Sequence, residues 1–158
     1  FVFGIILLCF YHIKYMSLKI FFICYFVIML VYTRQYFKNY MKTKLGVEFE
    51  IDFAHTLRGH PKCGKPHGHT SRIVVEVEGD VKKGDSYQDN MVIEFDAMKK
   101  LCWETIQELD HRNLNELFDF PTSENIAGWI FDHLKDKIPV SSIKFFEGTN
   151  KYCEITKD

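Results

Sequence analysis

Apolar and polar residues alternate over two stretches in the middle of the chain, although Val74 interrupts the alternation in the second. The first is V-E-F-E-I-D-F (residues 47–53), and the second runs through S-R-I-V-V-E-V-E-G (residues 71–79). A period of two is typical of a β-strand that buries one face. We therefore predict one strand over residues 46–54 and a second over residues 69–79, separated by a turn-rich loop.

Further along, the pattern changes to the period of a helix. Asp96 is predicted to cap a helix that continues to about Glu108, after a short extended piece over residues 91–95. Thr122 is predicted to cap a second helix, whose apolar stripe is I-x3-I-x3-L (residues 126–134). Residues 143–147 and 152–156 then form a closing strand pair.

These elements predict an α+β domain with a four-stranded antiparallel sheet and two helices on one face. The helices leave the other face of the sheet uncovered. A second copy of the chain is the expected cover, so we predict a homo-oligomer.

Three histidines extend the apolar faces of the two central strands. His55 keeps the parity of residues 47–53, and His67 and His69 keep the parity of the second strand. Three imidazoles that converge at one end of a sheet predict a metal site, and zinc is the usual occupant. Cys63 is open to two interpretations: a fourth ligand that closes a structural site, or a free nucleophile or base beside the metal.

Two acidic residues also occupy positions where chemistry is possible. Asp110 precedes His111, and a carboxylate beside an imidazole can orient a base for proton transfer, although a solvated turn has the same pattern. Glu147 shares the parity of the apolar residues of its strand, so it is predicted to point inward or to end the strand in solvent. An inward carboxylate needs a cation or several hydrogen-bond donors.

Charge and cysteine content narrow the class of protein. The 158 residues suit one domain, and residues 41–158 carry 16 basic and 21 acidic side chains. This acidic balance gives no electrostatic reason to expect nucleic-acid binding. Five scattered cysteines do not form a disulfide framework, so we predict a reducing, cytoplasmic location.

The first forty residues differ from the rest of the chain. They contain 13 of the 25 aromatic residues and the unbroken apolar run from Ile20 to Tyr32. Three interpretations are a membrane anchor, a signal-like segment, or translated sequence upstream of the true start. We favour the last, with a domain that begins at Met41 and covers residues 41–158.

Taken together, the motifs resemble those of the 6-pyruvoyl-tetrahydropterin synthase and 6-carboxy-tetrahydropterin synthase family. The matching segments are F-A-H (53–55), C-x3-H-G-H (63–69), M-V-I (91–93), L-D-H (109–111) with L-N (114–115), P-T (121–122) with E-N-I-A (124–127), and F-E (146–147). The resemblance implies the tunnelling fold, in which sheets of several subunits join around a barrel as a trimer or hexamer.

The resemblance also implies roles for individual residues. His55, His67 and His69 would bind one zinc ion per subunit. Cys63 would be the catalytic base, with Asp110 and His111 as its relay. The pterin would be bound by Glu147, with Thr122 and Ser123 beside it. Arg58, Lys62, Lys65 and Arg72 could meet a triphosphate or could be solvated loop charges.

The implied substrate is 7,8-dihydroneopterin triphosphate, and the short gap between Cys63 and His67 resembles the 6-carboxy branch. That reaction releases acetaldehyde and triphosphate and leads to 7-deazaguanine bases such as queuosine and archaeosine. Alternatives are 6-pyruvoyl-tetrahydropterin synthesis and a non-catalytic ligand-binding module with structural zinc. The chain departs from the family pattern at Asn90, Glu94 and Gly148.

Overall fold

The computed structural model describes residues 18–40, 42–81 and 83–157, and the chain divides into two units, Phe1–Met41 and Lys42–Asp158. In the first unit, helix α2 (Leu18–Tyr40) contains the apolar run, and its apolar side chains from Phe22 to Tyr32 are exposed. None of the helices in the described part of the chain has the length and apolar character needed to span a membrane. Residues 1–17 and the predicted start at Met41 lie outside the described residues.

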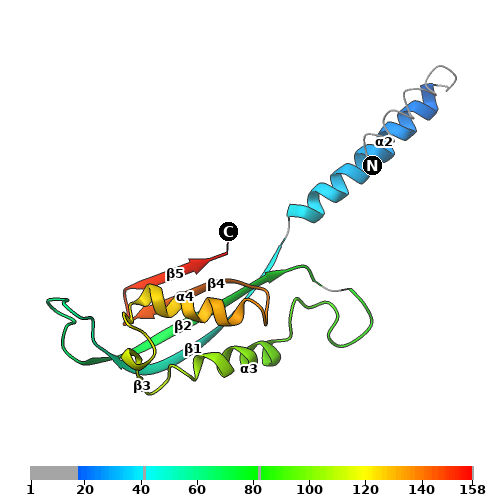
Figure 1. Cartoon of the computed structure of the whole chain (residues 1–158). Helices are drawn as coiled ribbons and strands as arrows, with labels where there is room; N and C mark the ends of the chain where they lie inside the picture. Colours follow the sequence, from blue (N-terminus) through cyan, green and yellow to red (C-terminus); the bar gives the residue numbers. More distant parts are fainter. Residues whose placement is uncertain (1–17, 41, 82, 158) are drawn as a thin grey trace. The chain divides into compact units, whose positions relative to one another are not determined.

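The second unit is an α+β domain built on one sheet (Figure 1). Its long strands are β1 (Thr43–His55) and β2 (His67–Gly79), followed by β4 (Val140–Glu147) and β5 (Tyr152–Thr156). The strand order is β3-β1-β2-β4-β5, and the four long strands pair antiparallel. The predicted strand pairing and fold class are therefore confirmed.

The prediction of four strands was one strand short. Strand β3 (Arg112–Asn113) pairs in parallel with Phe53 and Ala54 at the outer edge of β1, and a short 3-10 helix η2 (Leu114–Glu116) follows it. Two residues are too few to show an alternating pattern, so the sequence predicts a loop there.

Helices α3 (Phe95–Ile106) and α4 (Ser123–Leu134) cover one face of the sheet; in Figure 1, α4 lies over β2 and β4, and α3 lies alongside β1. The core lies between them and the inward residues of the strands. It includes Val47, Ile51, Phe53, Ile73, Val75, Val77, Met98, Cys102, Ile106, Ile126, Ile130, Leu134, Ile143 and Phe145. The alternation predicted for the two central strands is thus the alternation of buried and exposed residues in the structure.

The start of α3 differs from the prediction. Residues 91–94 contain no strand, and Glu94 rather than Asp96 caps the helix, because its carboxylate accepts hydrogen bonds from the amides of Asp96 and Ala97, both at 2.9 Å. These two hydrogen bonds lower the pKa of Glu94. Thr122 caps α4 as predicted.

Two of the departures from the family pattern lie at special backbone positions. Asn90 has φ of 65° and Gly148 has φ of 74°. Asparagine is one of the few side chains that tolerate this left-handed region, so Asn90 fits where glycine is common. At Gly148 the positive φ turns the chain from β4 into β5.

Opposite the helices, the sheet face carries paired charges. Lys144 lies 3.3 Å from Glu76 and 3.7 Å from Glu154, and Arg72 lies 3.3 Å from Glu48. No helix of the described part of this unit is seen to cover that face in Figure 1.

Candidate metal centre

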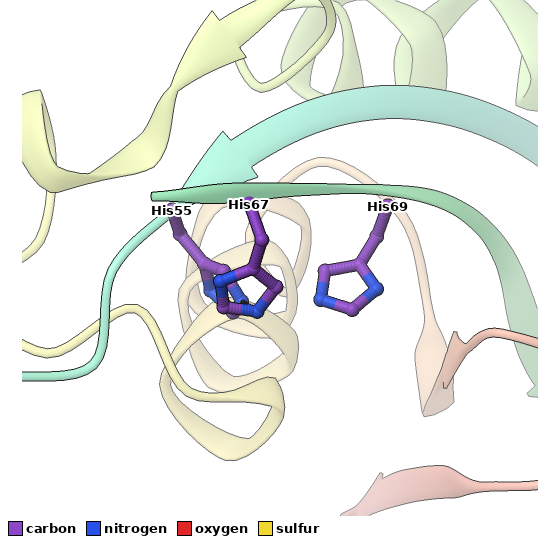
Figure 2. Close-up of side chains that lie close together, drawn as sticks. All are labelled: His55, His67 and His69. Carbon is purple, nitrogen blue, oxygen red and sulfur yellow. Dashed lines mark hydrogen bonds between the residues drawn. The ribbon is translucent and has the colours of Figure 1, made fainter. Parts of the chain in front are cut away.

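The register of β1 and β2 brings the three predicted histidines together. His55, the last residue of β1, pairs directly with His67, the first residue of β2, and His69 pairs with Phe53. Because the side chains alternate between faces, all three imidazoles leave the strands on the helix-covered side. Figure 2 shows the three rings pointing to the same side of the two strands.

One nitrogen of each ring lies within 4.8 Å of the others, and the Nε2 atoms of His55 and His67 are 3.1 Å apart. The outer nitrogens have main-chain partners: His55 Nδ1 lies 2.8 Å from the carbonyl of Pro121, and His67 Nδ1 lies 2.8 Å from that of Lys65. A carbonyl only accepts, so we assign the proton of each ring to Nδ1. The two Nε2 lone pairs then face each other.

The third ring is also poised to donate a lone pair. His69 Nε2 is buried and has no hydrogen-bond partner within the described chain. Burial is the largest cause that lowers the pKa of both His55 and His69, and the charge of His67 lowers both further. The hydrogen bond to Pro121 opposes the lowering at His55, and Glu147 opposes it at both. Neutral imidazoles are the form that binds metal.

A shared cation explains this arrangement better than a satisfied core does. Facing lone pairs repel, and a buried nitrogen without a partner is unfavourable. A metal ion bound by three nitrogens removes both problems, and main-chain acceptors on the outer nitrogens are the usual support of such ligands. The residues present therefore fit a three-histidine metal centre with a coordination position open.

Glu147 extends this site from the neighbouring strand. It pairs with Ser71 in the β2–β4 register, and its side chain is 17% exposed. Its Oε2 atom accepts a hydrogen bond from Ser123 Oγ at 3.1 Å, and Oε1 lies 2.8 Å from Lys151 Nζ. Burial alone would raise the pKa of Glu147, but the hydrogen bonds from Lys151 and Ser123 outweigh it and the pKa is lowered.

The segment at the start of α4 contacts both His55 and Glu147. Pro121 supplies the carbonyl that orients His55, and Thr122 Oγ1 accepts a hydrogen bond from Asn125 N, 3.3 Å away, at the start of the helix. Ser123 contacts Glu147. The predicted binding residue Thr122 is thus a helix cap, and Ser123 is a partner of the predicted pterin-binding carboxylate.

Cys63 lies in the loop between β1 and β2 and is half-buried. The loop folds back on itself: the amide of Cys63 donates to His60 Nδ1 at 2.9 Å, and its carbonyl accepts from the amide of Leu57 at 2.9 Å. At Gly64 a Cβ atom would come within 2.5 Å of the His60 carbonyl oxygen, so only glycine fits there.

Lys151 belongs to the site although its sequence position gave no sign of it. Its hydrogen bond to Glu147, then the charge of Glu147 and, more weakly, that of Cys63 raise the pKa of Lys151. The positive charge of Lys151 in turn lowers the pKa of His69 slightly. Lys151 is therefore a direct partner of the Glu147 carboxylate beside the cluster.

Asp110 and His111 are not joined to the three histidines by any hydrogen bond of the described chain. Asp110 Oδ1 accepts from the amide of Asp52 at 3.0 Å, and the His111 amide donates to the Asp52 carbonyl at 2.6 Å. His111 Nε2 is 3.8 Å from Asp110 Oδ2, and the His111 side chain is 76% exposed. Asp110 and His111 therefore lie beside the outer edge of β1, next to Asp52.

The four basic residues that could meet a phosphate divide into two groups. Arg58, Lys62 and Lys65 are exposed in the loop that carries Cys63. Arg72 instead lies on the sheet face opposite the histidines, where its guanidinium is 4.0 Å from the centre of the Phe146 ring. Within one chain, Arg72 is therefore apart from the candidate site.

Known proteins of one family match nearly the whole second unit. Residues 44–158 match the family model described as 6-pyruvoyl tetrahydropterin synthase. An Archaeoglobus fulgidus protein, provisionally named 6-carboxy-5,6,7,8-tetrahydropterin synthase, is 37% identical over 114 residues, which cover 72% of this chain and 95% of that protein. A Haemophilus influenzae protein named 6-carboxy-5,6,7,8-tetrahydropterin synthase is 34% identical over 137 residues, which cover 70% of this chain and 96% of that protein.

A third relative and a solved structure carry other names. Dihydroneopterin monophosphate aldolase of Pyrococcus furiosus is 38% identical over 99 residues, which cover 63% of this chain and 81% of that protein. The structure of Caenorhabditis elegans 6-pyruvoyl tetrahydropterin synthase superposes with a TM-score of 0.65 at 22% identity, covering 75% of this chain and 97% of that one. This likeness confirms the tunnelling fold.

Proposed function

Because the chain belongs to the 6-pyruvoyl tetrahydropterin synthase family, we propose that it is a zinc-dependent 6-carboxy-5,6,7,8-tetrahydropterin synthase. It would convert 7,8-dihydroneopterin triphosphate to 6-carboxy-tetrahydropterin, acetaldehyde and triphosphate. The observation that carries this proposal is the pair of facing Nε2 atoms, 3.1 Å apart, with the Glu147 carboxylate on β4, the strand next to β2. The names of the Archaeoglobus and Haemophilus relatives favour the 6-carboxy branch.

The chain's own residues supply the binding and proton-transfer steps. His55, His67 and His69 would hold zinc, which supplies a Lewis acid with one position open. Glu147 would accept two N–H groups of the pterin edge, with Ser123 beside it. Cys63 would accept and return a proton of the substrate side chain as the general base.

A second copy of the chain would supply the remaining proton-transfer group. His111 and Asp110 lie at the outer edge of β1. On that side, only Phe53 and Ala54 of β1 pair with another strand of the described chain. We propose that subunits join at this edge, in a trimer or hexamer, and that His111 of one copy serves the metal centre of another. The uncovered sheet face would then line the interior of the assembly.

Residues 41–158 would make up the functional domain, in the cytoplasm, and its product would be used for 7-deazaguanine bases. The four cysteines within the described residues are all free, in keeping with a reducing location.

The test is product analysis for the wild-type chain and Cys63→Ala, with 7,8-dihydroneopterin triphosphate as substrate and metal content measured for both proteins. We expect acetaldehyde from the wild type alone and one zinc per chain in both. A 6-pyruvoyl product without acetaldehyde would place the protein in the sister branch. Zinc lost in Cys63→Ala, with no turnover by the wild type, would instead indicate a structural metal site in a binding module.

One relative favours a second candidate reaction. The Pyrococcus protein is named for an aldolase reaction on dihydroneopterin monophosphate, and it is as similar in sequence as the 6-carboxy relatives. Parallel assays with the monophosphate and the triphosphate separate the two. Turnover of the monophosphate alone would replace the proposed substrate while leaving the roles of the histidines unchanged.

A further inference from the structure

The Glu147 carboxylate has two partners inside the chain. Lys151 Nζ lies 2.8 Å from Oε1, and Ser123 Oγ lies 3.1 Å from Oε2. An ionised carboxylate offers about four lone-pair sites. Lys151 and Ser123 use one on each oxygen, so one remains on each oxygen for the two parallel N–H groups of a pterin edge.

The hairpin between β4 and β5 places Lys151 opposite Glu147. Phe146 pairs with Tyr152, and the Glu147 amide donates to the Lys151 carbonyl at 3.1 Å, so residues 147 and 151 form the next cross-strand pair. The Lys151 side chain is 65% exposed, whereas that of Glu147 is 17% exposed. Lys151 therefore reaches down from the surface onto a largely buried carboxylate.

We propose that Lys151 is a positioning residue that holds the Glu147 carboxylate in one orientation for recognition of the pterin. This inference rests on the proposed function, in which Glu147 binds the pterin edge. A carboxylate already oriented by two partners loses less conformational freedom when the ligand binds. The charge of Lys151 also offsets that of Glu147 at a site where water is partly excluded.

The simpler alternative is a surface ion pair with no role in binding. Exposed pairs of this kind contribute little to stability, and many contribute nothing that can be measured. If Lys151 only forms a surface ion pair, replacing it leaves pterin binding unchanged. If Lys151 positions Glu147, replacing it weakens pterin binding, and this effect disappears when the Glu147 carboxylate is removed.

The test is a double-mutant cycle on the full zinc-loaded chain, with binding of neopterin followed by its fluorescence. Neopterin carries the pterin edge without a phosphate, so phosphate contacts do not enter. The variants are Lys151→Met, Lys151→Arg, Glu147→Gln and the double variant Lys151→Met/Glu147→Gln. Lys135→Met is the matched control, because it removes a lysine from an exposed ion pair with Asp132 on α4.

We expect Lys151→Met to weaken neopterin binding about tenfold, as for loss of one hydrogen bond to a charged group. Lys151→Arg and Lys135→Met should bind like the wild type, and Lys151→Met should have no further effect in the Glu147→Gln background. With substrate, Lys151→Met should raise KM and leave kcat unchanged. Unchanged binding by Lys151→Met, or an undiminished effect in the Glu147→Gln background, would overturn the inference.

Failure of the proposed function has a different signature. If Glu147→Gln binds neopterin as the wild type does, Glu147 is not the pterin anchor. If the wild type does not bind neopterin at all, the pterin assignment itself is wrong, and the inference is overturned with it.

Discussion

Two sets of ionisable groups lie near the C-terminal end of β1, and the fold satisfies them to different degrees. The imidazoles of His55, His67 and His69 are close together with two lone pairs facing and one buried nitrogen without a partner in the described chain. Asp110 and the His111 backbone, in contrast, have their partners in the main chain of Asp52. The histidine nitrogens are arranged to bind a cation, whereas the His111 ring is exposed beside the edge of β1.

This difference favours the proposal that one chain forms the histidine cluster and that a second copy supplies the rest of the site. The histidines are brought together by the pairing of β1 with β2, which one chain contains. The His111 ring points into solvent at an edge that is open to another chain. The predictions below test this division, beginning with the largest expected effect.

Replacing a histidine of the cluster should abolish both metal binding and turnover. In His69→Ala, two imidazoles remain, and two nitrogen ligands hold zinc weakly. We expect zinc content near zero and activity reduced by more than about a thousandfold. His133→Ala, which removes an exposed histidine on α4, is the control and should retain both. Full zinc occupancy in His69→Ala would show that the cluster is not the metal centre.

We expect His111 to contribute to turnover and not to metal binding. The variant His111→Asn suits the test, because residue 111 has φ of 53° and asparagine tolerates that conformation. We expect unchanged zinc content and turnover about a hundredfold lower, as for loss of a general acid–base group. If another copy supplies His111, co-expression with Cys63→Ala should restore part of the activity. Activity that stays at the level of the two single variants would contradict a shared site.

The sequence was sufficient to predict the histidine cluster and insufficient to predict its surroundings, for physical reasons. Side chains alternate along a strand, so the parity of His55 with residues 47–53 follows from local sequence alone. The contact between Asp110 and Asp52 joins residues 58 positions apart. No local pattern contains such a contact, and the sequence could not show that this carboxylate caps the β1 edge.

The same distinction between local pattern and distant contact explains why the roles of Lys151 and Glu94 were not predicted from the sequence. Lys151 contacts Glu147 only because the turn at Gly148 makes residues 147 and 151 a cross-strand pair. One residue more or fewer in the turn would have put Lys151 on the other face. At α3, Asp96 and Glu94 are both possible caps, and the chain conformation before Phe95 decides between them.

Asp110 should contribute to stability more than His111 does. Asp110→Ala removes the acceptor of the Asp52 amide at the β1 edge, and we expect the free energy of unfolding to fall by about 1 kcal/mol. His111→Asn should change it by less than about 0.5 kcal/mol, because the ring is exposed and makes no buried contact. Denaturant unfolding of the three proteins measures both. Equal losses in the two variants would show that the pair acts as one structural unit.

The smallest effect we expect is a pH dependence of the metal-free protein. The pKa values of His55 and His69 are lowered below 6.5 in the folded chain, chiefly by burial. As the pH falls below about 6.5, the unfolded chain takes up protons that the folded chain does not, so stability falls until the pH passes the folded pKa values. Denaturant unfolding from pH 8 to pH 5 measures this loss, which lies mostly above the pH range in which carboxylates titrate. The loss should shrink in His69→Ala, which removes one of the two groups, and should persist in His133→Ala. A loss of equal size in His69→Ala would assign the pH dependence to groups outside the cluster.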